Sequence, residues 1–289
     1  MTPRFRYLNA LAIFVTSVLS CSFLLVGCGS STTTSSHPDA HKATASVPYD
    51  LVSPGYLTVG TGSDRPPMEF MDTNTHQPDG FDIDLIKAIA LRMNLQVKVM
   101  PASIDTLIPA LNANHYDVVI SGMTITNKRK QEASFVPYFS QGEALLVQNS
   151  NPHAIESLAD LCGQSVGVQS GSLEQVDLQI ASDACKKAGK PAINSLVLPD
   201  QSAVIQLLAT NRVVATYQDS PVTDYYLQQN AGRFAMAGVV FNTAIAGIAV
   251  RKTDIVLQTS VQNAFNQIER DGTYHTLLAK WGLADGAIA

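Results

Sequence analysis

Three short stretches of the chain place polar or charged residues directly after apolar runs typical of buried strands. One stretch supplies an arginine and another an aspartate. Arginine offers a planar set of donors that matches a carboxylate, and an aspartate can accept hydrogen bonds from an ammonium group. Such a set could hold both ends of a small zwitterion. The candidate ligand-binding residues in these stretches are Ser121, Gly122, Thr124, Arg129, Gly171, Ser172, Gln218 and Asp219.

Taken singly, the two charged residues have simpler interpretations. Arg129 falls in the first turn of a helix expected over residues 127–133, where it could form a surface ion pair. Asp219 precedes a helix expected to start at Pro221, where it could serve as a cap. The combination of one cation, one anion and two turns of small residues favours ligand binding over these alternatives.

Other chemistries find little support in the sequence. The six histidines are scattered, and we find no nucleophile–His–acid set, no phosphate-binding loop and no metal-ligand spacing. We therefore predict no catalytic residue, no cofactor and no metal site. The formal net charge is −5 and no run of basic residues is longer than three, so nucleic acid is not an expected partner.

The elements that position these residues follow an α/β pattern. Residues 57–61 read as a strand and 81–93 as an amphipathic helix, followed by a helix near 107–111 and a strand at 117–121. A similar helix–strand unit recurs at residues 204–217. In open α/β sheets, ligands bind beyond the carboxyl ends of the strands. The repeated plan therefore predicts two α/β lobes with the polar stretches at their strand ends.

The N-terminus has the pattern of an export signal. Arg4 and Arg6 precede an apolar run that ends at Gly27-Cys28, similar to the cleavage box of bacterial lipoproteins. This predicts removal of residues 1–27 and lipidation of Cys28. A plain signal peptide, a membrane anchor and cleavage before Cys21 are the alternatives. The Ser/Thr-rich stretch that follows, residues 29–46, cannot bury a core and is expected to be a tether.

Two cysteines remain in the expected globular part, Cys162 and Cys185. In an exported domain such a pair suggests a disulfide, with two buried free thiols as the alternative.

The polar stretches resemble family 3 of the bacterial extracellular solute-binding proteins, the polar amino acid binders of ATP-driven importers. The resemblance covers about residues 55–285 and rests on VGTGSDRPPMEF (59–70), GFDIDLIKAIA (80–90), IPALNANHYDVVISGMTIT (108–126) with Arg129, VGVQSGS (166–172), QDSPV (218–222), GIAVRK (247–252) and DGTYHTLLAKWG (271–282). It implies the type II two-lobe periplasmic fold, with a discontinuous lobe 1 joined to lobe 2 by two hinge strands. The expected boundaries are a signal peptide at 1–27, a tether at 28–52, lobe 1 at 53–145, lobe 2 at 146–244 and the rest of lobe 1 at 245–289.

The resemblance also assigns a role to each end of the ligand. Arg129 and Thr124 would hold the α-carboxylate, helped by backbone N–H groups near Gly171 and Ser172. At the other end, Asp219 would hold the ammonium group.

Carbonyl groups near Ser121 and Gly122 would assist Asp219, and Gln218 could touch the side chain of the ligand.

The sequence departs from the family pattern at three positions. An acid that often follows VGT is Gly62, one ligand-covering aromatic is Arg65, and a second is Ile104. Loss of an acid and gain of an arginine would make the pocket more positive, which favours an acidic or amide side chain on the ligand. Asp64 could replace the lost acid. Arg65 is counted among the ligand-binding candidates, with a solvated residue at the rim as the alternative.

The resulting expectation is a monomeric, lipid-anchored, extracytoplasmic binding protein, and not an enzyme. Its partners would be a free amino acid and the permease subunits of an ABC importer, and it would touch the membrane through its lipid anchor only. The alternative is a periplasmic prephenate or arogenate dehydratase on the same fold. Glu143, Glu69 or Asp64 could supply its acid or base, but nothing in the sequence places any of them beside Arg129.

Overall fold

The computed structural model describes residues 49–288. The predicted signal peptide, the lipidation site Cys28 and most of the predicted tether lie outside these residues. Within the described part, no helix has both the length and the apolar composition needed to cross a bilayer.

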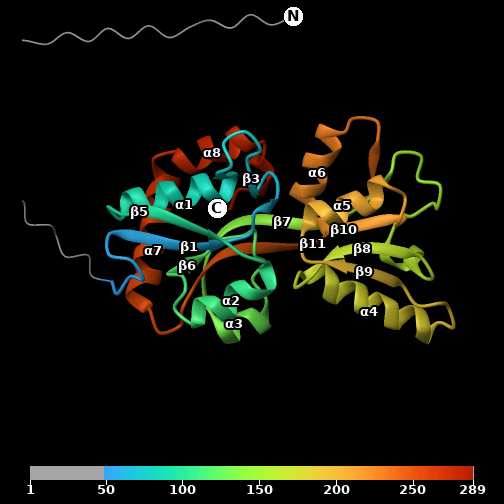
Figure 1. Ribbon diagram of the computed structural model, residues 1–289, viewed down its shortest axis with the longest axis horizontal. Coiled ribbons are helices and arrows are strands. Elements are labelled where there is room, and N and C mark those ends of the chain that lie inside the picture. The colour runs from blue at the N-terminus through green and yellow to red at the C-terminus, as the bar shows by residue number, and fades with distance from the viewer. Residues whose placement is uncertain (1–48, 289) are drawn as a thin grey trace, which may run out of the picture. The chain divides into compact units, whose positions relative to one another are not determined.

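One mixed sheet runs through the described part of the chain (Figure 1). It has eight strands in the order β5-β1-β6-β11-β7-β10-β8-β9. In that order the strands are Gln96–Pro101, Tyr56–Thr61, Val118–Val119, Phe234–Val250, Ser134–Gln148, Ala215–Asp219, Ser165–Gln169 and Asn194–Leu198. A small three-stranded sheet consists of β2 (Asp64–Arg65), β3 (Glu69–Met71) and β4 (Pro78–Asp79).

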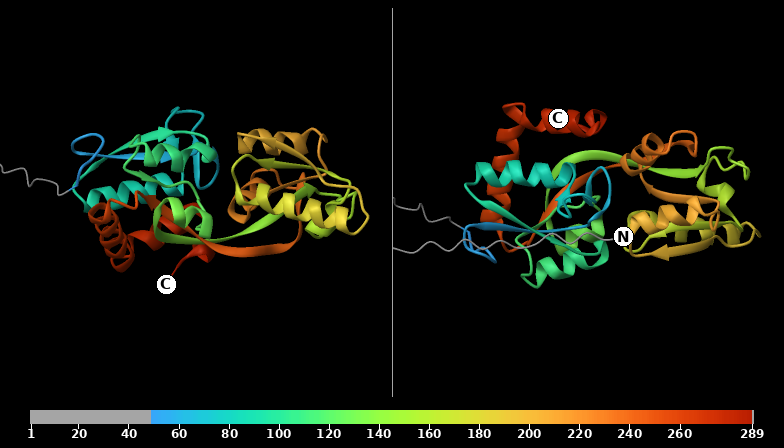
Figure 2. Two further views of the ribbon diagram at one scale, coloured as in Figure 1. Left: turned by 90° about the horizontal axis from the view of Figure 1, so that it is seen from below. Right: turned by 45° about the horizontal axis from the view of Figure 1, so that its top comes forward.

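Lobe 1 is built on β5, β1 and β6, with helices on both faces of the sheet (Figures 1 and 2). Its helices are α1 (Phe81–Arg92), α2 (Ile104–Asn112), α3 (Asn127–Glu132), α7 (Ile255–Arg270) and α8 (Thr273–Trp281). The apolar faces of α1, α7 and α8 enclose one buried cluster, and α2 packs in a second cluster on the opposite face. The two C-terminal helices therefore return to lobe 1, as the sequence predicts.

Lobe 2 is built on β10, β8 and β9 in the same way. Its helices are α4 (Leu173–Lys187), α5 (Gln201–Ala209) and α6 (Ser220–Gln229). Helix α4 packs in one cluster of buried residues, and α5 and α6 contribute to another. A disulfide joins Cys162, after the 3₁₀ turn Leu158–Leu161, to Cys185 on α4.

Strands β7 and β11 are long antiparallel neighbours that connect the two lobes. They contain the two extended stretches, residues 144–147 and 245–250, that the sequence identifies as crossovers. The two-lobe α/β fold with two hinge strands is thereby confirmed. Both strands run without a break through the predicted lobe boundaries at 145 and 244, so those exact boundaries stay predictions.

Strand β6 is shorter than the predicted strand at residues 117–121. Its first predicted residue, Asp117, uses its side chain to accept hydrogen bonds from Thr58 N at 2.7 Å and Val52 N at 2.9 Å. At the other end, Gly122 adopts φ +48°, which turns the backbone out of the strand. The strand therefore ends where the candidate site begins.

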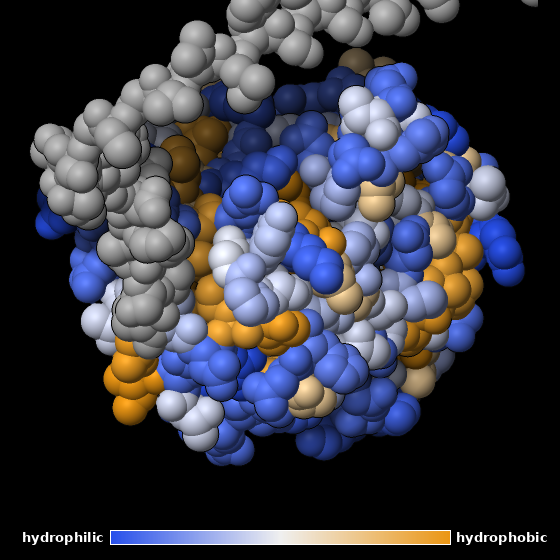
Figure 3. All heavy atoms as spheres, turned by 60° about the vertical axis from the view of Figure 1, so that its left-hand side comes forward, coloured by the Kyte–Doolittle hydropathy of each residue, from blue (hydrophilic) through white to orange (hydrophobic). Residues whose placement is uncertain are grey.

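The outer end of lobe 1 shows a surface of mixed character (Figure 3). Polar residues cover most of this face, and the apolar residues form separate patches among them. Such scattered apolar exposure is ordinary for a folded domain.

Candidate functional site

The structure places Arg129 at the junction of the two lobes. Its Nη1 donates to Thr124 O at 2.9 Å and its Nη2 donates to Gly171 O in lobe 2 at 3.2 Å. The backbone N–H of Arg129 donates to Thr126 Oγ1 at 3.1 Å, which caps α3 and fixes the base of the side chain. Burial lowers the pKa of Arg129. Three of the predicted residues, Thr124, Arg129 and Gly171, thus come together.

The turn that faces Arg129 in lobe 2 approaches lobe 1 closely. Gly171 has φ +74°, and a Cβ atom at this position would lie 2.6 Å from Cβ of Asp105. Only glycine fits this combination of a left-handed backbone and a tight contact. Ser172 caps α4 by accepting a hydrogen bond from Gln175 N at 3.2 Å. Both predicted residues therefore line the junction between the lobes.

A cavity of about 460 Å³ opens beside these residues. It lies between α2 and α3 of lobe 1 and the start of α4 of lobe 2. Its lining includes Arg129, Gly171, Ser172 and Ile104. The predicted carboxylate-binding end thus has open space next to its cation.

Asp219 lies at the end of β10 and is buried at the same junction. Its Oδ2 accepts a hydrogen bond from Arg65 Nη1 at 3.0 Å, and its Oδ1 accepts one from Gln141 Nε2 at 2.8 Å. Gln141 Nε2 also donates to Gly122 O at 2.8 Å. The carboxylate therefore contacts two side chains that are held by lobe 1.

The neighbouring Gln218 points elsewhere. Successive side chains of a strand alternate between faces, and Gln218 Nε2 donates to Thr223 Oγ1 of α6 at 2.6 Å. The structure thus places the amide nitrogen of Gln218 inside lobe 2.

Arg65 is buried, with 5% of its surface exposed, and so it is not a solvated rim residue. Its Nε donates to Glu69 Oε1 at 2.8 Å, its Nη1 donates to Asp219, and its Nη2 donates to the carbonyl oxygen of Ser121. A Cβ atom at position 122 would lie 2.6 Å from Arg65 Nη2, so Gly122 leaves the room that the guanidinium occupies. Arg65 therefore links both lobes at the centre of the site.

Glu69 is the main site residue that the sequence prediction of binding residues missed. It is fully buried and lies opposite Arg65 in the β2–β3 pairing. A Cβ atom on Gly62 would lie 3.1 Å from Glu69 Oε1, so Glu69 supplies a carboxylate beside the position where the family acid is missing. The signal was the turn-forming pair Pro66-Pro67, which brings Arg65 and Glu69 into register.

Asp64, which the sequence suggested as a substitute for the missing acid, turns toward lobe 2 instead. Its Oδ2 accepts hydrogen bonds from Gln169 Nε2 at 2.9 Å and from Gln201 N at 2.5 Å. Glu143, another acid considered for the dehydratase alternative, accepts hydrogen bonds from Tyr217 and from Asn242. Neither acid is hydrogen-bonded to Arg129.

Two further residues hold the loop after β6. Gly122 N donates to Asp82 Oδ2 at 2.7 Å, and Tyr138 donates its hydroxyl hydrogen to the same carboxylate. Burial raises the pKa of Asp82 to about 6. Asp82 and Tyr138 thereby fix the backbone at Ser121 and Gly122, whose carbonyl groups face Arg65 and Gln141.

Burial controls the protonation of the carboxyl groups in the cleft. It raises the pKa of Glu174 to about 8, with a further contribution from the charge of Asp219. It also raises the pKa values of Glu69 and Asp219, although Arg65 lowers both. The site therefore contains more buried carboxyl groups than positively charged side chains that could pair with them.

Several buried acceptors around this site lack a hydrogen-bond donor within the described part of the chain. Those on residues that the structure places at the cleft are Glu69 Oε2, Gln141 Oε1 and Glu174 Oε1. Buried polar atoms normally have a partner, so this group indicates a site that can accept hydrogen bonds from a ligand.

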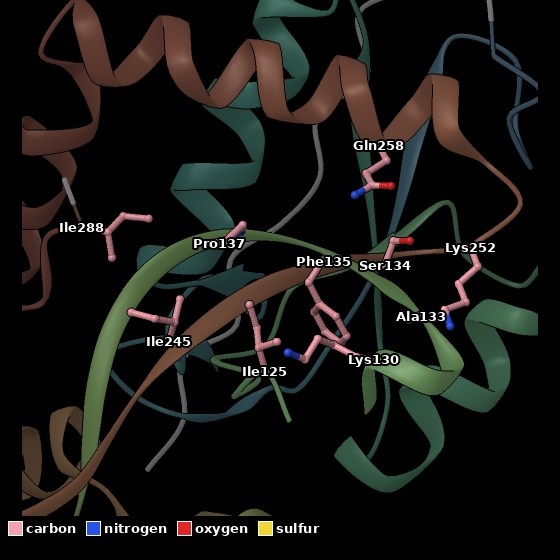
Figure 4. A pocket seen from close by; sticks show the side chains of 10 residues that line it. All are labelled: Ile125, Lys130, Ala133, Ser134, Phe135, Pro137, Ile245, Lys252, Gln258 and Ile288. Atoms are coloured by element: carbon pink, nitrogen blue, oxygen red, sulfur yellow. The ribbon is translucent and has the colours of Figure 1, made fainter. Parts of the chain in front are cut away.

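A larger cavity, of about 750 Å³, lies elsewhere (Figure 4). It borders β7, β11 and α7, and the side chains of Phe135, Ile245 and Gln258 point into it. None of the predicted ligand-binding residues lines it. Size alone therefore does not identify the site in this protein.

Comparisons with known proteins identify relatives that are named as amino-acid-binding proteins. ABC transporter arginine-binding protein 1 of Escherichia coli (strain K12) is 28% identical over 242 residues, covering 82% of this chain and 95% of the relative. An ancestral arginine-binding protein bound to arginine is 38% identical, with a TM-score of 0.72 over 78% of this chain and 98% of its own. An ancestral arginine-binding protein bound to glutamine is 36% identical, with a TM-score of 0.73 over 80% and 99% of the two chains.

These relatives are named as binding proteins, which confirms the expectation of a binding protein over an enzyme. The profile of "Bacterial extracellular solute-binding proteins, family 3" matches residues 57–284. The match spans both lobes and every predicted ligand-binding residue. The chain belongs to family 3 of the bacterial extracellular solute-binding proteins.

Proposed function

We propose that this protein captures a free polar amino acid between its lobes and delivers it to an ABC importer. The observation that carries the proposal is that Arg129 of lobe 1 reaches Gly171 O of lobe 2 at 3.2 Å, while Asp219 of lobe 2 accepts a hydrogen bond from Arg65 of lobe 1 at 3.0 Å. A cation and an anion thus lie at the junction of the two lobes. A free amino acid needs this pair of receptors, one for its carboxylate and one for its ammonium group. The relatives that are named for arginine support the same class of ligand.

The unpaired acceptors of the cleft narrow the choice of ligand side chain. Arg65 adds one positive charge, but Glu69 and Asp219 already balance it. The cleft therefore gains no excess positive charge from Arg65. We propose a ligand whose side chain donates hydrogen bonds, either an amide or a cation. The amide is common to this proposal and to the interpretation of the sequence.

Capture would proceed by closure of the lobes about β7 and β11. A ligand that contacts both lobes only in the closed form stabilises that form, and the importer would recognise it. Already in the structure, hydrogen bonds such as that of Arg129 to Gly171 link the lobes. The permease subunits of the importer are the proposed protein partners.

We further propose that the protein acts as a monomer outside the cytoplasm, anchored through lipidated Cys28. The support for anchoring is the cleavage-box pattern of the first 28 residues and the Ser/Thr-rich stretch after it. The extracytoplasmic location agrees with the family of extracellular solute-binding proteins to which the chain belongs. Labelling with a fatty-acid analogue, lost in Cys28→Ala, would test the anchor.

A thermal-shift screen of the twenty amino acids against residues 46–289, which form one compact unit, tests the ligand class. A ligand at a hundred times its Kd should stabilise the fold by about 2.7 kcal/mol. For a domain of this size that corresponds to roughly 5–10 °C. We expect the largest shifts with glutamine or arginine. A largest shift with glutamate or aspartate would support the acidic interpretation, and no shift with any amino acid would contradict the function.

Turnover of prephenate or arogenate by the same protein would support the dehydratase alternative instead. We expect none, because Asp64 and Glu143, two of the acids considered for that reaction, are held by hydrogen bonds to other residues and neither is hydrogen-bonded to Arg129.

A further inference from the structure

Arg65 uses the same acceptors that the ammonium group of an amino acid would need. Its Nη1 lies 3.0 Å from Asp219 Oδ2, and its Nη2 donates to the carbonyl oxygen of Ser121. The other carboxylate oxygen of Asp219 is taken by Gln141 at 2.8 Å. The proposed ammonium receptor is therefore already filled by a cation of the protein itself.

The surroundings of Arg65 are built to hold it there. Glu69 is fully buried and binds Nε at 2.8 Å, which orients the guanidinium toward Asp219. Gly122 lacks the Cβ atom that would collide with Nη2. Glu69 also accepts a hydrogen bond from Ser121 Oγ at 2.9 Å, so the anchor and the carbonyl acceptor are fixed to each other.

The carboxylate end differs from the ammonium end. Arg129 borders the cavity of about 460 Å³, whereas neither Arg65 nor Asp219 lines that cavity. An amino acid could thus approach Arg129 through open space, but it would meet an occupied receptor at Asp219.

We infer that Arg65 is a specificity-determining residue that an incoming amino acid must displace from Asp219 and Ser121 before it is fully bound. This inference rests on the proposed function. The ammonium group takes over both acceptors, while Arg65 keeps its hydrogen bond to Glu69 and swings its Nη atoms away. A ligand held by its carboxylate alone cannot replace the guanidinium, so Arg65 excludes analogues that lack the ammonium group.

Displacement lowers the measured affinity, because the binding-competent form is only a fraction of the ligand-free protein. If the Arg65–Asp219 contact is populated at about 90–99%, its removal tightens binding roughly ten- to hundred-fold. Titration calorimetry of L-glutamine and L-arginine with residues 46–289 measures the dissociation constants and so tests this change in affinity. We expect Arg65→Ala to bind the preferred of the two amino acids roughly ten- to hundred-fold more tightly than the unaltered protein.

Two further variants sharpen the experiment. Arg65→Gln retains a donor for Glu69 but cannot pair with Asp219 as a cation, so this variant should also bind the amino acid more tightly. It keeps the test possible if Arg65→Ala does not fold. Arg92→Ala is the matched control, because Arg92 forms an exposed ion pair with Asp271 in lobe 1, outside the cleft. It should leave the affinity unchanged.

Small molecules that mimic the side chain of Arg65 or a ligand without its ammonium group give an independent test. Guanidinium chloride at low millimolar concentration should compete with the amino acid in Arg65→Ala, because the ion can enter the empty place beside Asp219, and it should have no such effect on the unaltered protein. Glutaramate, which is glutamine without its ammonium group, should not bind the unaltered protein.

Weaker binding by both Arg65 variants would overturn the inference and make Arg65 an ordinary ligand contact. Binding of glutaramate as tight as that of glutamine would overturn it too. Both outcomes leave the proposed function intact, since the unaltered protein still binds an amino acid. Failure of the unaltered protein to bind any of the twenty amino acids would instead contradict the function itself.

Discussion

Arg65 in lobe 1 and Asp219 in lobe 2 form a buried ion pair across the cleft, with Nη1 3.0 Å from Oδ2. Breaking one half of such a pair leaves the other charge buried without a partner, which is costly. The pair therefore couples the arrangement of the lobes to the charge at the ligand site.

Arg129→Ala should abolish most ligand binding. The guanidinium is the proposed partner of the ligand carboxylate, and loss of a charge-assisted pair of hydrogen bonds should cost about 3 kcal/mol, or roughly a hundred-fold in Kd. Titration calorimetry with the preferred amino acid measures this change. Lys130→Ala on the same helix is exposed and serves as the control. An affinity that is undiminished in Arg129→Ala would reject the carboxylate assignment.

Gly171→Ala should hinder closure of the lobes. The added Cβ atom would lie 2.6 Å from Cβ of Asp105 in lobe 1. Gly189→Ala is a matched control, because Gly189 has a similar φ of +71° but an added Cβ atom would meet nothing within 4 Å. Both changes carry the backbone cost of roughly 1–2 kcal/mol, but only Gly171→Ala should lower ligand affinity.

Small-angle scattering can separate these two effects. With saturating ligand, the radius of gyration of Gly171→Ala should stay larger than that of Gly189→Ala. Equal radii and equal affinities would show that the contact between Gly171 and Asp105 does not limit closure.

The stability of the ligand-free protein should fall as pH rises from about 5 to 9. Burial and the charge of Asp219 raise the pKa of Glu174 from 4.5 to about 8. The folded state thus holds this proton more tightly than the unfolded state. The stabilisation that this proton gives the folded state is fully present below the pKa of Glu174 in the unfolded chain. It is lost as the pH rises through the pKa of Glu174 in the folded protein. Burial also raises the pKa of Glu143 to about 7, so ionisation of this residue likewise lowers the stability of the folded protein as the pH rises.

Glu174→Gln should flatten this dependence, because a neutral amide replaces a carboxyl group that must otherwise ionise while buried. Urea unfolding between pH 5 and 9 measures the slope. Glu156→Gln changes an exposed glutamate of the same lobe and should leave the slope as it is. An unchanged slope in Glu174→Gln would mean that other carboxyl groups carry the effect.

Removal of the disulfide should destabilise lobe 2. Cys162 and Cys185 are separated by 23 residues, and the chain-entropy treatment gives about 3 kcal/mol for a loop of this length. We expect the melting temperature of the Cys162→Ser, Cys185→Ser double variant to fall by roughly 6–12 °C. Dithiothreitol should lower that of the unaltered protein similarly and leave the double variant unchanged; insensitivity of the unaltered protein would contradict the bond.

The sequence predicted the larger elements well because they bury regular apolar faces. The recurrence of Phe81, Leu85 and Ile89 marks α1, and all three residues are buried. The continuous apolar stretches in β7 and β11 likewise reflect strands that pair on both sides. Strand β6 was predicted too long, because the side chain of Asp117 and the turn at Gly122 end it early.

The site was only partly accessible to sequence reasoning. Residues at strand ends, such as Arg129 and Asp219, follow from the rule for open α/β sheets. The partners of Arg65 did not follow, because Asp219 lies 154 residues away and only the folded chain brings them together. Gln141, which binds Asp219, lies within a long hinge strand, where its polar side chain gave no local signal.

Both ends of the described chain belong to the same lobe. Tyr49 and Leu51 pack on the core of lobe 1, and so does Ile288 near the C-terminus. If the proposed lipid anchor at Cys28 forms, the protein is therefore attached to the membrane through lobe 1, and lobe 2 is connected to it only by the hinge strands β7 and β11.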